Sequence, residues 1–252
     1  MAESVTASDA LVFDSHCHLG LLDDGPPPPA CLLLATACDH WPRLLSLAAP
    51  AWDRWVAAGL HPAWAQQWQE GTAAALAALL ARPEVVAVGE VGLDDRQGPA
   101  AAVQEQVLRQ QISLARQWDK PLVLHGRGRY GRLLELLRQE DAAAVGGILH
   151  GFSGSVELAR QFIALGFAIG VGPVLLRPGV RRLPQALRQL PPQALVLESD
   201  APALLATTAA VAPQTLLALL ADRLAGLCGL SPAVLVAHHQ ANCRRILRLP
   251  SL

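Results

Sequence analysis

Eight short apolar runs, separated by longer segments of helical character, limit the fold of this 252-residue chain more than any other feature. Between the runs, apolar residues recur at three- and four-residue spacing, as in Val107, Leu108 and Ile112, which is typical of amphipathic helices. The runs predict eight strands: Leu11–His16, Cys31–Ala37, Trp55–Leu60, Val85–Glu90, Leu122–His125, Gly147–His150, Ala168–Val171 and Ala194–Glu198.

Eight strands alternating with helices over about 250 residues fit a (β/α)8 TIM barrel. A doubly wound open sheet is the main alternative, but it predicts a Gly-x-Gly-x-x-Gly turn after the first strand, where this chain has His16-Cys17-His18. We therefore predict an α/β protein with one barrel domain over residues 1–252. The helical patterns Gln214–Leu227 and Pro232–Leu247 are expected to complete the outer ring of helices.

Two histidines one residue apart end the first predicted strand. Because side chains alternate between the faces of a strand, His16 and His18 point to the same side and can hold one metal ion. Further candidate ligands stand at the ends of later strands: Glu90, His125, His150, Glu198 and Asp200. In a barrel these ends meet at one mouth, where the active site lies. The recurrence predicts the metal centre of a hydrolase.

The candidate ligands outnumber the four that one tetrahedral ion binds, which indicates two ions. Imidazole with carboxylate suits zinc, manganese, cobalt or iron; we expect two divalent ions, with zinc, manganese or magnesium as the candidates. The predicted ligands are His16, His18, Glu90 and Asp200 for one ion, and Glu90, His125 and His150 for the other. Asp200 would orient a water molecule and take its proton as general base. Glu198 is expected to support a ligand rather than to bind.

The composition narrows the choice of partners and location. The formal net charge of −1 does not predict a general attraction to nucleic acid, although bound divalent ions would add positive charge. The apolar runs are shorter than the roughly 20 residues of a membrane helix, and no secretory signal is visible at the N-terminus. Five cysteines without a Cys-x-x-Cys pair favour reduced thiols. We expect a cytoplasmic protein without membrane contact, as a monomer rather than a large assembly.

Six motifs in order resemble those of the TatD family of metal-dependent deoxyribonucleases, within the amidohydrolase-like barrels, from Leu11 to about Pro202. They are Phe13–Leu19, Gly59–Pro62, Gly89–Asp94, Pro121–Arg127, His150–Gly154 and Glu198–Pro202. The resemblance implies metal ligands at His16, His18, Glu90, His125, His150 and Asp200. It further implies contacts from Arg127 and His61 to a substrate phosphate, and places Asp94 beside a ligand histidine.

This resemblance implies hydrolysis of phosphodiester bonds in DNA. The segment Ala203–Pro213, however, carries no charged residue where the family has polar groups, which favours a small ester, amide or lactone as the alternative substrate. A metal-binding protein without turnover is a third possibility that the complete ligand set disfavours. The remaining histidines and tryptophans are assigned to loops, helix faces or packing: His40, His238, His239, Trp41, Trp52, Trp55, Trp64 and Trp68. For the tryptophans, a wall on which bases stack is the alternative.

Overall fold

The structure of the protein, a computed structural model, describes residues 11–22, 26–202 and 211–250. Eight parallel strands form one sheet in which every neighbour in sequence is a neighbour in space. The strands are β1 Asp14–Cys17, β2 Cys31–Leu34, β3 Arg54–Ala58, β4 Val85–Asp94, β5 Leu122–Arg127, β6 Gly147–Leu149, β7 Phe167–Val171 and β8 Leu195–Leu197. This order confirms the predicted (β/α)8 barrel.

The barrel closes between β1 and the segment that follows β8. One parallel bridge joins Cys17 to Ala201. The backbone N–H of His18 donates to the carbonyl of Ala201 at 2.7 Å, and that of Asp200 donates to the carbonyl of His16 at 3.0 Å. Closure therefore places Asp200 directly beside the two histidines of the first strand.

The apolar residues of the strands divide between two separate hydrophobic clusters. In β2, Leu32 and Leu34 face the barrel interior, whereas Cys31 and Leu33 pack against the helices. All four side chains are fully buried. Burial on both faces explains why the strands appear in the sequence as continuous apolar runs rather than as an alternating pattern.

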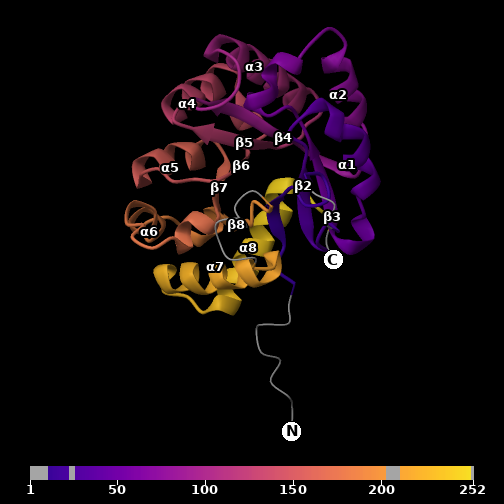
Figure 1. Cartoon of the computed structure of the whole chain (residues 1–252). Coiled ribbons are helices and arrows are strands. Elements are labelled where there is room, and N and C mark those ends of the chain that lie inside the picture. Colours follow the sequence, from indigo (N-terminus) through magenta and orange to yellow (C-terminus); the bar gives the residue numbers. More distant parts are fainter. Residues whose placement is uncertain (1–10, 23–25, 203–210, 251–252) are drawn as a thin grey trace.

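Seven helices, α1 to α7, lie around the strands (Figure 1). They are α1 Trp41–Leu47, α2 Thr72–Leu80, α3 Ala101–Gln117, α4 Tyr130–Gln139, α5 Val156–Ala164, α6 Arg182–Leu187 and α7 Pro213–Cys228. Short 3-10 turns connect several elements: η1 Cys38–His40, η2 Pro50–Trp52, η3 Pro62–Gln67, η4 Ala142–Ala144, η5 Pro173–Leu176 and η6 Pro192–Ala194.

The sequence pattern predicts that helix α8 (Pro232–Leu247) completes the outer ring, but this prediction is wrong. The helix instead covers the amino-terminal end of the barrel. Its residues Cys243 and Leu247 belong to the same cluster as Val123 and Val196, which point into the barrel. In Figure 1, α8 accordingly lies nearer the centre of the view than α1 to α7. Helical periodicity marks a buried face, but the apolar barrel end and the flank of the sheet are equally suitable partners for such a face.

A buried histidine attaches α8 to the strands. The Nδ1 atom of His239 accepts from the backbone N–H of Leu197 at 3.0 Å, and its Nε2 donates to the carbonyl of Phe13 at 2.6 Å. Burial lowers the pKa of His239 to about 4, so the ring stays neutral at neutral pH. No single helix among the described residues has the length and hydropathy to cross a membrane. Helices α7 and α8 meet these two criteria only when they are taken together, and they are bent by 104° at the break between them.

Truncation of Leu247 to alanine is expected to destabilise the protein by about 2–5 kcal/mol, because it leaves a cavity under the barrel. Urea unfolding followed by circular dichroism measures the change. Val234→Ala is the matched control, since Val234 lies on the same helix with 45% of its surface exposed. It should cost less than about 0.5 kcal/mol. Equal effects of the two changes would contradict the position assigned to α8.

Strands β4 and β5 run further than their sequence patterns predict. Glu90 and His125 therefore lie within strands rather than at strand ends. Gly92 allows this extension: it has φ +155°, and a Cβ atom there would lie 1.9 Å from the carbonyl oxygen of His125. The pairing register shifts between Val88 and Val91, on either side of Glu90. Glycine suggests the end of a strand in a sequence, but here it permits the close approach of two strands.

Candidate metal centre

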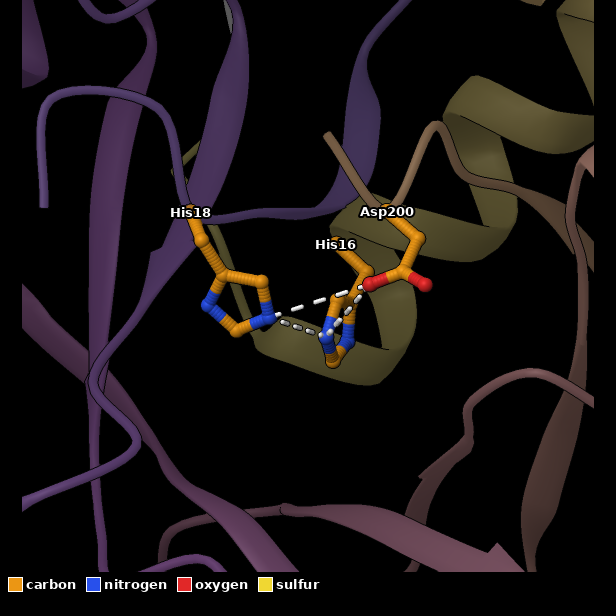
Figure 2. Close-up of side chains that lie close together, drawn as sticks. All are labelled: His16, His18 and Asp200. Atoms are coloured by element: carbon orange, nitrogen blue, oxygen red, sulfur yellow. Dashed lines mark hydrogen bonds and ion pairs between the residues drawn. The ribbon is translucent and has the colours of Figure 1, made fainter. Parts of the chain in front are cut away.

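Four side chains of the predicted first group converge at the barrel mouth. The Nε2 atoms of His16 and His18 lie 3.0 Å apart. Oδ1 of Asp200 lies 3.9 Å and 3.8 Å from these two nitrogens (Figure 2). Oε2 of Glu90 lies 3.3 Å and 3.5 Å from them. Ligands about 2.0–2.1 Å from a tetrahedral ion are separated by about 3.3 Å, so this donor set fits one divalent ion.

The orientation of His18 is determined by its second ring nitrogen. Its Nδ1 donates to the backbone carbonyl of Leu34 at 2.8 Å, which leaves the lone pair of Nε2 directed at the cluster. Burial lowers the pKa of His18 to about 4, with a smaller contribution from His16. A neutral imidazole held in one tautomer is the form that binds metal ions.

His150 forms an ion pair with Glu198. Oε1 of Glu198 lies 3.0 Å from Nδ1 of His150 and also accepts from the backbone N–H of Gly151 at 2.7 Å. The Nε2 atom of His150 lies 3.8 Å from Oδ1 of Asp200 and 4.0 Å from Oε1 of Glu90. Burial opposes protonation of this ring, but the negative charges of Glu198, Asp200 and Glu90 outweigh it and raise the pKa of His150 to about 10. Surroundings that favour a proton on His150 also favour a cation at its Nε2.

His125 has carboxylates on both ring nitrogens. Its Nδ1 lies 2.9 Å from Oε1 of Glu90, and its Nε2 lies 2.9 Å from Oδ2 of Asp94. Burial disfavours the protonated ring, yet these two carboxylates raise the pKa of His125 above its ordinary value. The group of possible ligands around it is His61, Glu90 and His125, whereas His150 is grouped with His16 and Glu90. This differs from the expected group of Glu90, His125 and His150, whose two rings lie 6.4 Å apart by centroid.

Asp94 lies beside a histidine of the predicted ligand set, as the resemblance implies. Besides His125, its carboxylate accepts backbone N–H groups of Arg96 at 2.7 Å and Gln97 at 3.1 Å. Burial raises the pKa of a carboxyl group, but these hydrogen bonds, led by that of His125, lower the pKa of Asp94 to about 2. Gln104 holds the same turn through both the N–H and the carbonyl of Asp94.

A cavity of about 380 Å³ opens over these residues. His61, which precedes η3, borders it; its Nδ1 accepts from the backbone N–H of Ala63 at 3.1 Å, so Nε2 carries the proton on the cavity side, 3.8 Å from Oε1 of Glu90. Arg127 is exposed at the end of β5 and borders the same cavity. His40, to which the sequence assigns no role, also lines it; the spacing of a loop histidine does not reveal the direction of its side chain.

Asp14 is a buried residue of the site that the sequence reasoning missed. Its Oδ1 accepts from the backbone N–H groups of Ser199 at 2.9 Å and His16 at 3.3 Å, and its Oδ2 accepts from the hydroxyl of Ser199 at 2.5 Å. Burial raises the pKa of Asp14 to about 6 despite these bonds. The carboxylate thus ties β1 to the segment that carries Asp200. A charged residue inside an apolar strand was the available signal, because burial of an unpaired charge is costly.

Replacement of Glu198 by glutamine is expected to weaken metal binding by about 10- to 100-fold, because the amide lacks the negative charge that the carboxylate holds beside His150. Competition with a chromogenic chelator measures the affinity, and circular dichroism checks the fold. Glu135→Gln is the control, since Glu135 lies on the surface of α4 with 57% of its side chain exposed. Unchanged affinity in the Glu198 variant would show that His150 needs no such support.

Comparison with known proteins places this geometry among related barrels. The family model described as TatD related DNase matches residues 28–248. The metal-dependent hydrolase YjjV of Escherichia coli is 34% identical over 205 residues, which cover 75% of this chain and 79% of YjjV. A 3'-5' ssDNA/RNA exonuclease TatD of Edwardsiella piscicida is 40% identical over 153 residues, which cover 60% of this chain and 59% of that protein. The crystal structure of the E. coli TatD homologue YjjV superposes with a TM-score of 0.81 at 27% identity, covering 95% of this chain and 98% of the other.

Proposed function

Because the chain belongs to the TatD-related DNase family of metal-dependent hydrolases, we propose that it hydrolyses phosphodiester bonds at the end of a single-stranded nucleic acid. The observation that carries the proposal is the convergence of His16, His18, Glu90 and Asp200 on one point at the barrel mouth. The name of the Edwardsiella relative, a 3'-5' ssDNA/RNA exonuclease, supports the choice of substrate.

In this proposal the residues around Glu90 would hold two divalent ions. His16, His18, Glu90 and Asp200 would hold one ion. Glu90, His125 and His150 would hold the other, since a ring nitrogen of His125 and one of His150 lie 2.9 Å and 4.0 Å from Oε1 of Glu90. Zinc, manganese and magnesium are the candidate ions. Such ions, when bound, lower the pKa of a water molecule and stabilise the charge that develops on the phosphate oxygens.

Asp200 is the proposed general base. Its side chain is 16% exposed, whereas those of Glu90, Asp94 and Glu198 are 3% exposed or less. It borders the cavity, so of these four carboxylates it is the one best able to reach a water molecule from solvent. The hydrogen bond from its backbone N–H to His16 and the support of Ser199 by Asp14 hold the carboxylate in place to accept the proton.

His61 and Arg127 are the proposed contacts to the scissile phosphate. The acceptor role of Nδ1 fixes His61 as a donor through Nε2, and burial lowers its pKa to about 4, so it donates as a neutral ring. Arg127 borders both the main cavity and an adjoining one of about 210 Å³, which is lined by Gly126, Gly151 and Ser153 among others. An exposed guanidinium between two cavities suits an oxygen-rich group that bridges them.

The alternative of a small ester, amide or lactone rests on the uncharged segment Ala203–Pro213, of which residues 203–210 lie outside the described part of the chain. The assay on chromogenic esters tests this alternative. The cytoplasmic location, the monomeric state and the single domain over residues 1–252 also stay predictions.

The deciding experiment assays purified protein, with its metal content quantified, on 5'-labelled single-stranded and duplex DNA and on chromogenic esters. We expect the single strand to shorten stepwise from its 3' end, EDTA to stop the reaction, and added Mn²⁺, Zn²⁺ or Mg²⁺ to restore it. Cleavage of the esters with both DNA forms left intact would contradict the proposal and favour the small-substrate alternative.

A further inference from the structure

Trp64 is a large apolar side chain that borders the cavity over the metal centre. It lies on η3, three residues after His61, and 45% of its surface is exposed. Leu22, also 45% exposed, borders the same cavity. One part of the cavity wall is therefore apolar, while Arg127, His61 and the carboxylates make the rest polar.

Three other tryptophans near β3, namely Trp41, Trp55 and Trp68, have structural roles. The indole N–H groups of Trp41, Trp55 and Trp68 donate to Gly59, Asp53 and Gln110, respectively, at 2.8–3.0 Å. Among the described residues, the indole N–H of Trp64 has no hydrogen-bond partner. An exposed indole that neither packs in the core nor completes a hydrogen bond is available to a ligand.

Trp64 is also held on a rigid element. Its neighbours Pro62 and Ala65 are buried, and His61 caps the start of η3 through the N–H of Ala63. Trp68, just after η3, is fixed by its hydrogen bond to Gln110 on α3. A preorganised aromatic surface loses little conformational entropy when it binds a flat ligand.

We propose that Trp64 is the platform on which the unpaired terminal base of a single-stranded nucleic acid stacks, while the adjoining phosphate lies toward His61 and Arg127. The proposal rests on the proposed function of this site. Stacking on Trp64 would supply binding affinity for nucleic acid that the net charge of −1 does not supply. Base–aromatic stacking needs no excess of basic residues and tolerates any base. A duplex end keeps its terminal base paired and stacked, so the platform also disfavours duplex DNA.

The test is a cycle that removes the indole from the protein and the base from the substrate. Two 5'-labelled single-stranded oligonucleotides are compared, one with a normal 3'-terminal nucleotide and one with an abasic 3'-terminal residue. Binding is measured by fluorescence anisotropy in an Asp200→Asn background, which retains the substrate uncut. KM and kcat are measured in the otherwise unchanged protein. Trp64→Ala is expected to bind the normal oligonucleotide about 5- to 150-fold more weakly, with the loss in KM rather than in kcat.

On the abasic oligonucleotide, Trp64→Ala and the unchanged protein should bind within about twofold of each other, because the partner of the indole is missing. Trp64→Phe keeps an aromatic face and should retain most of the affinity. Trp52→Ala is the matched control: Trp52 is 71% exposed but precedes β3, whereas Trp64 follows it, so the two lie toward opposite ends of the barrel.

Two outcomes would overturn the inference alone: Trp64→Ala binding the normal oligonucleotide like the unchanged protein, or losing the same factor on both oligonucleotides, which would indicate a structural role. An equal loss in Trp52→Ala would do the same. If the unchanged protein neither binds nor cuts either oligonucleotide, the proposed function fails and this inference fails with it. The behaviour of the unchanged protein thus separates the two failures.

Discussion

Replacement of Glu90 by glutamine is expected to weaken metal binding by more than about 100-fold, because even the loss of a group that only supports a ligand costs about 10- to 100-fold. The carboxylate of Glu90 is buried among the imidazoles of five histidines. Their ring nitrogens lie 2.9–4.0 Å from its two oxygens. Glutamine keeps the size of the side chain but removes the negative charge shared by both proposed ion sites.

Metal quantification after dialysis and single-turnover hydrolysis measure this prediction. At a metal concentration that saturates the unchanged protein, the variant should keep less than about 1% of the activity. Glu84→Gln is the matched control, because Glu84 directly precedes the same strand and forms a surface ion pair with Arg82. Full metal content and activity in the Glu90 variant would remove Glu90 from the proposed centre.

The Asp200→Asn variant is expected to lose about 10²- to 10⁴-fold in kcat, which is the usual contribution of a general base. The amide oxygen can still face His16 and His18, so the variant should bind at least one ion and should change KM by less than about threefold. Because Asp200 is also a proposed ligand of the first ion, the metal content of the variant distinguishes a loss of proton transfer from a loss of metal.

Steady-state kinetics with metal quantification on the same preparation measure the effect. Asp222→Asn, on the exposed face of α7, is the control and should be indistinguishable from the unchanged protein. A variant that keeps more than about a tenth of kcat would show that another group accepts the proton, and Asp200 would then be left with a binding role alone.

The barrel could be predicted from the sequence because its information is local. Strands such as β2 and β7 are buried on both faces and therefore appear as continuous apolar runs, and the long helices show a helical period. The position of polar residues toward the carboxyl ends of the strands then indicated the proposed site, although Glu90 and His125 lie within extended strands. Of the residues singled out in this way, His16, His18, Glu90 and Asp200 lie within a few ångströms of each other.

Other features depended on contacts between distant segments. Spacing did not reveal the partner of α8, the extension of β4 beyond Glu90 or the fact that His125 is the histidine that Asp94 contacts. Asp14 became a member of the site only when closure of the barrel brought Ser199, 185 residues away, to its carboxylate. Trp64 and His40 line the cavity, which could not be predicted from the sequence, because a loop sequence does not specify where its side chains point.

The sequence by itself determined the barrel, and it predicted the barrel mouth as the site with imidazole and carboxylate side chains as ligands. These follow from hydrophobic periodicity and from the position of polar residues along single strands. The tertiary structure alone decided which nitrogen of each histidine faces the centre, which histidine each supporting carboxylate contacts, and which wall of the cavity is apolar. Those properties depend on hydrogen bonds and packing between segments that are far apart in the chain, and such contacts exist only once the barrel has closed.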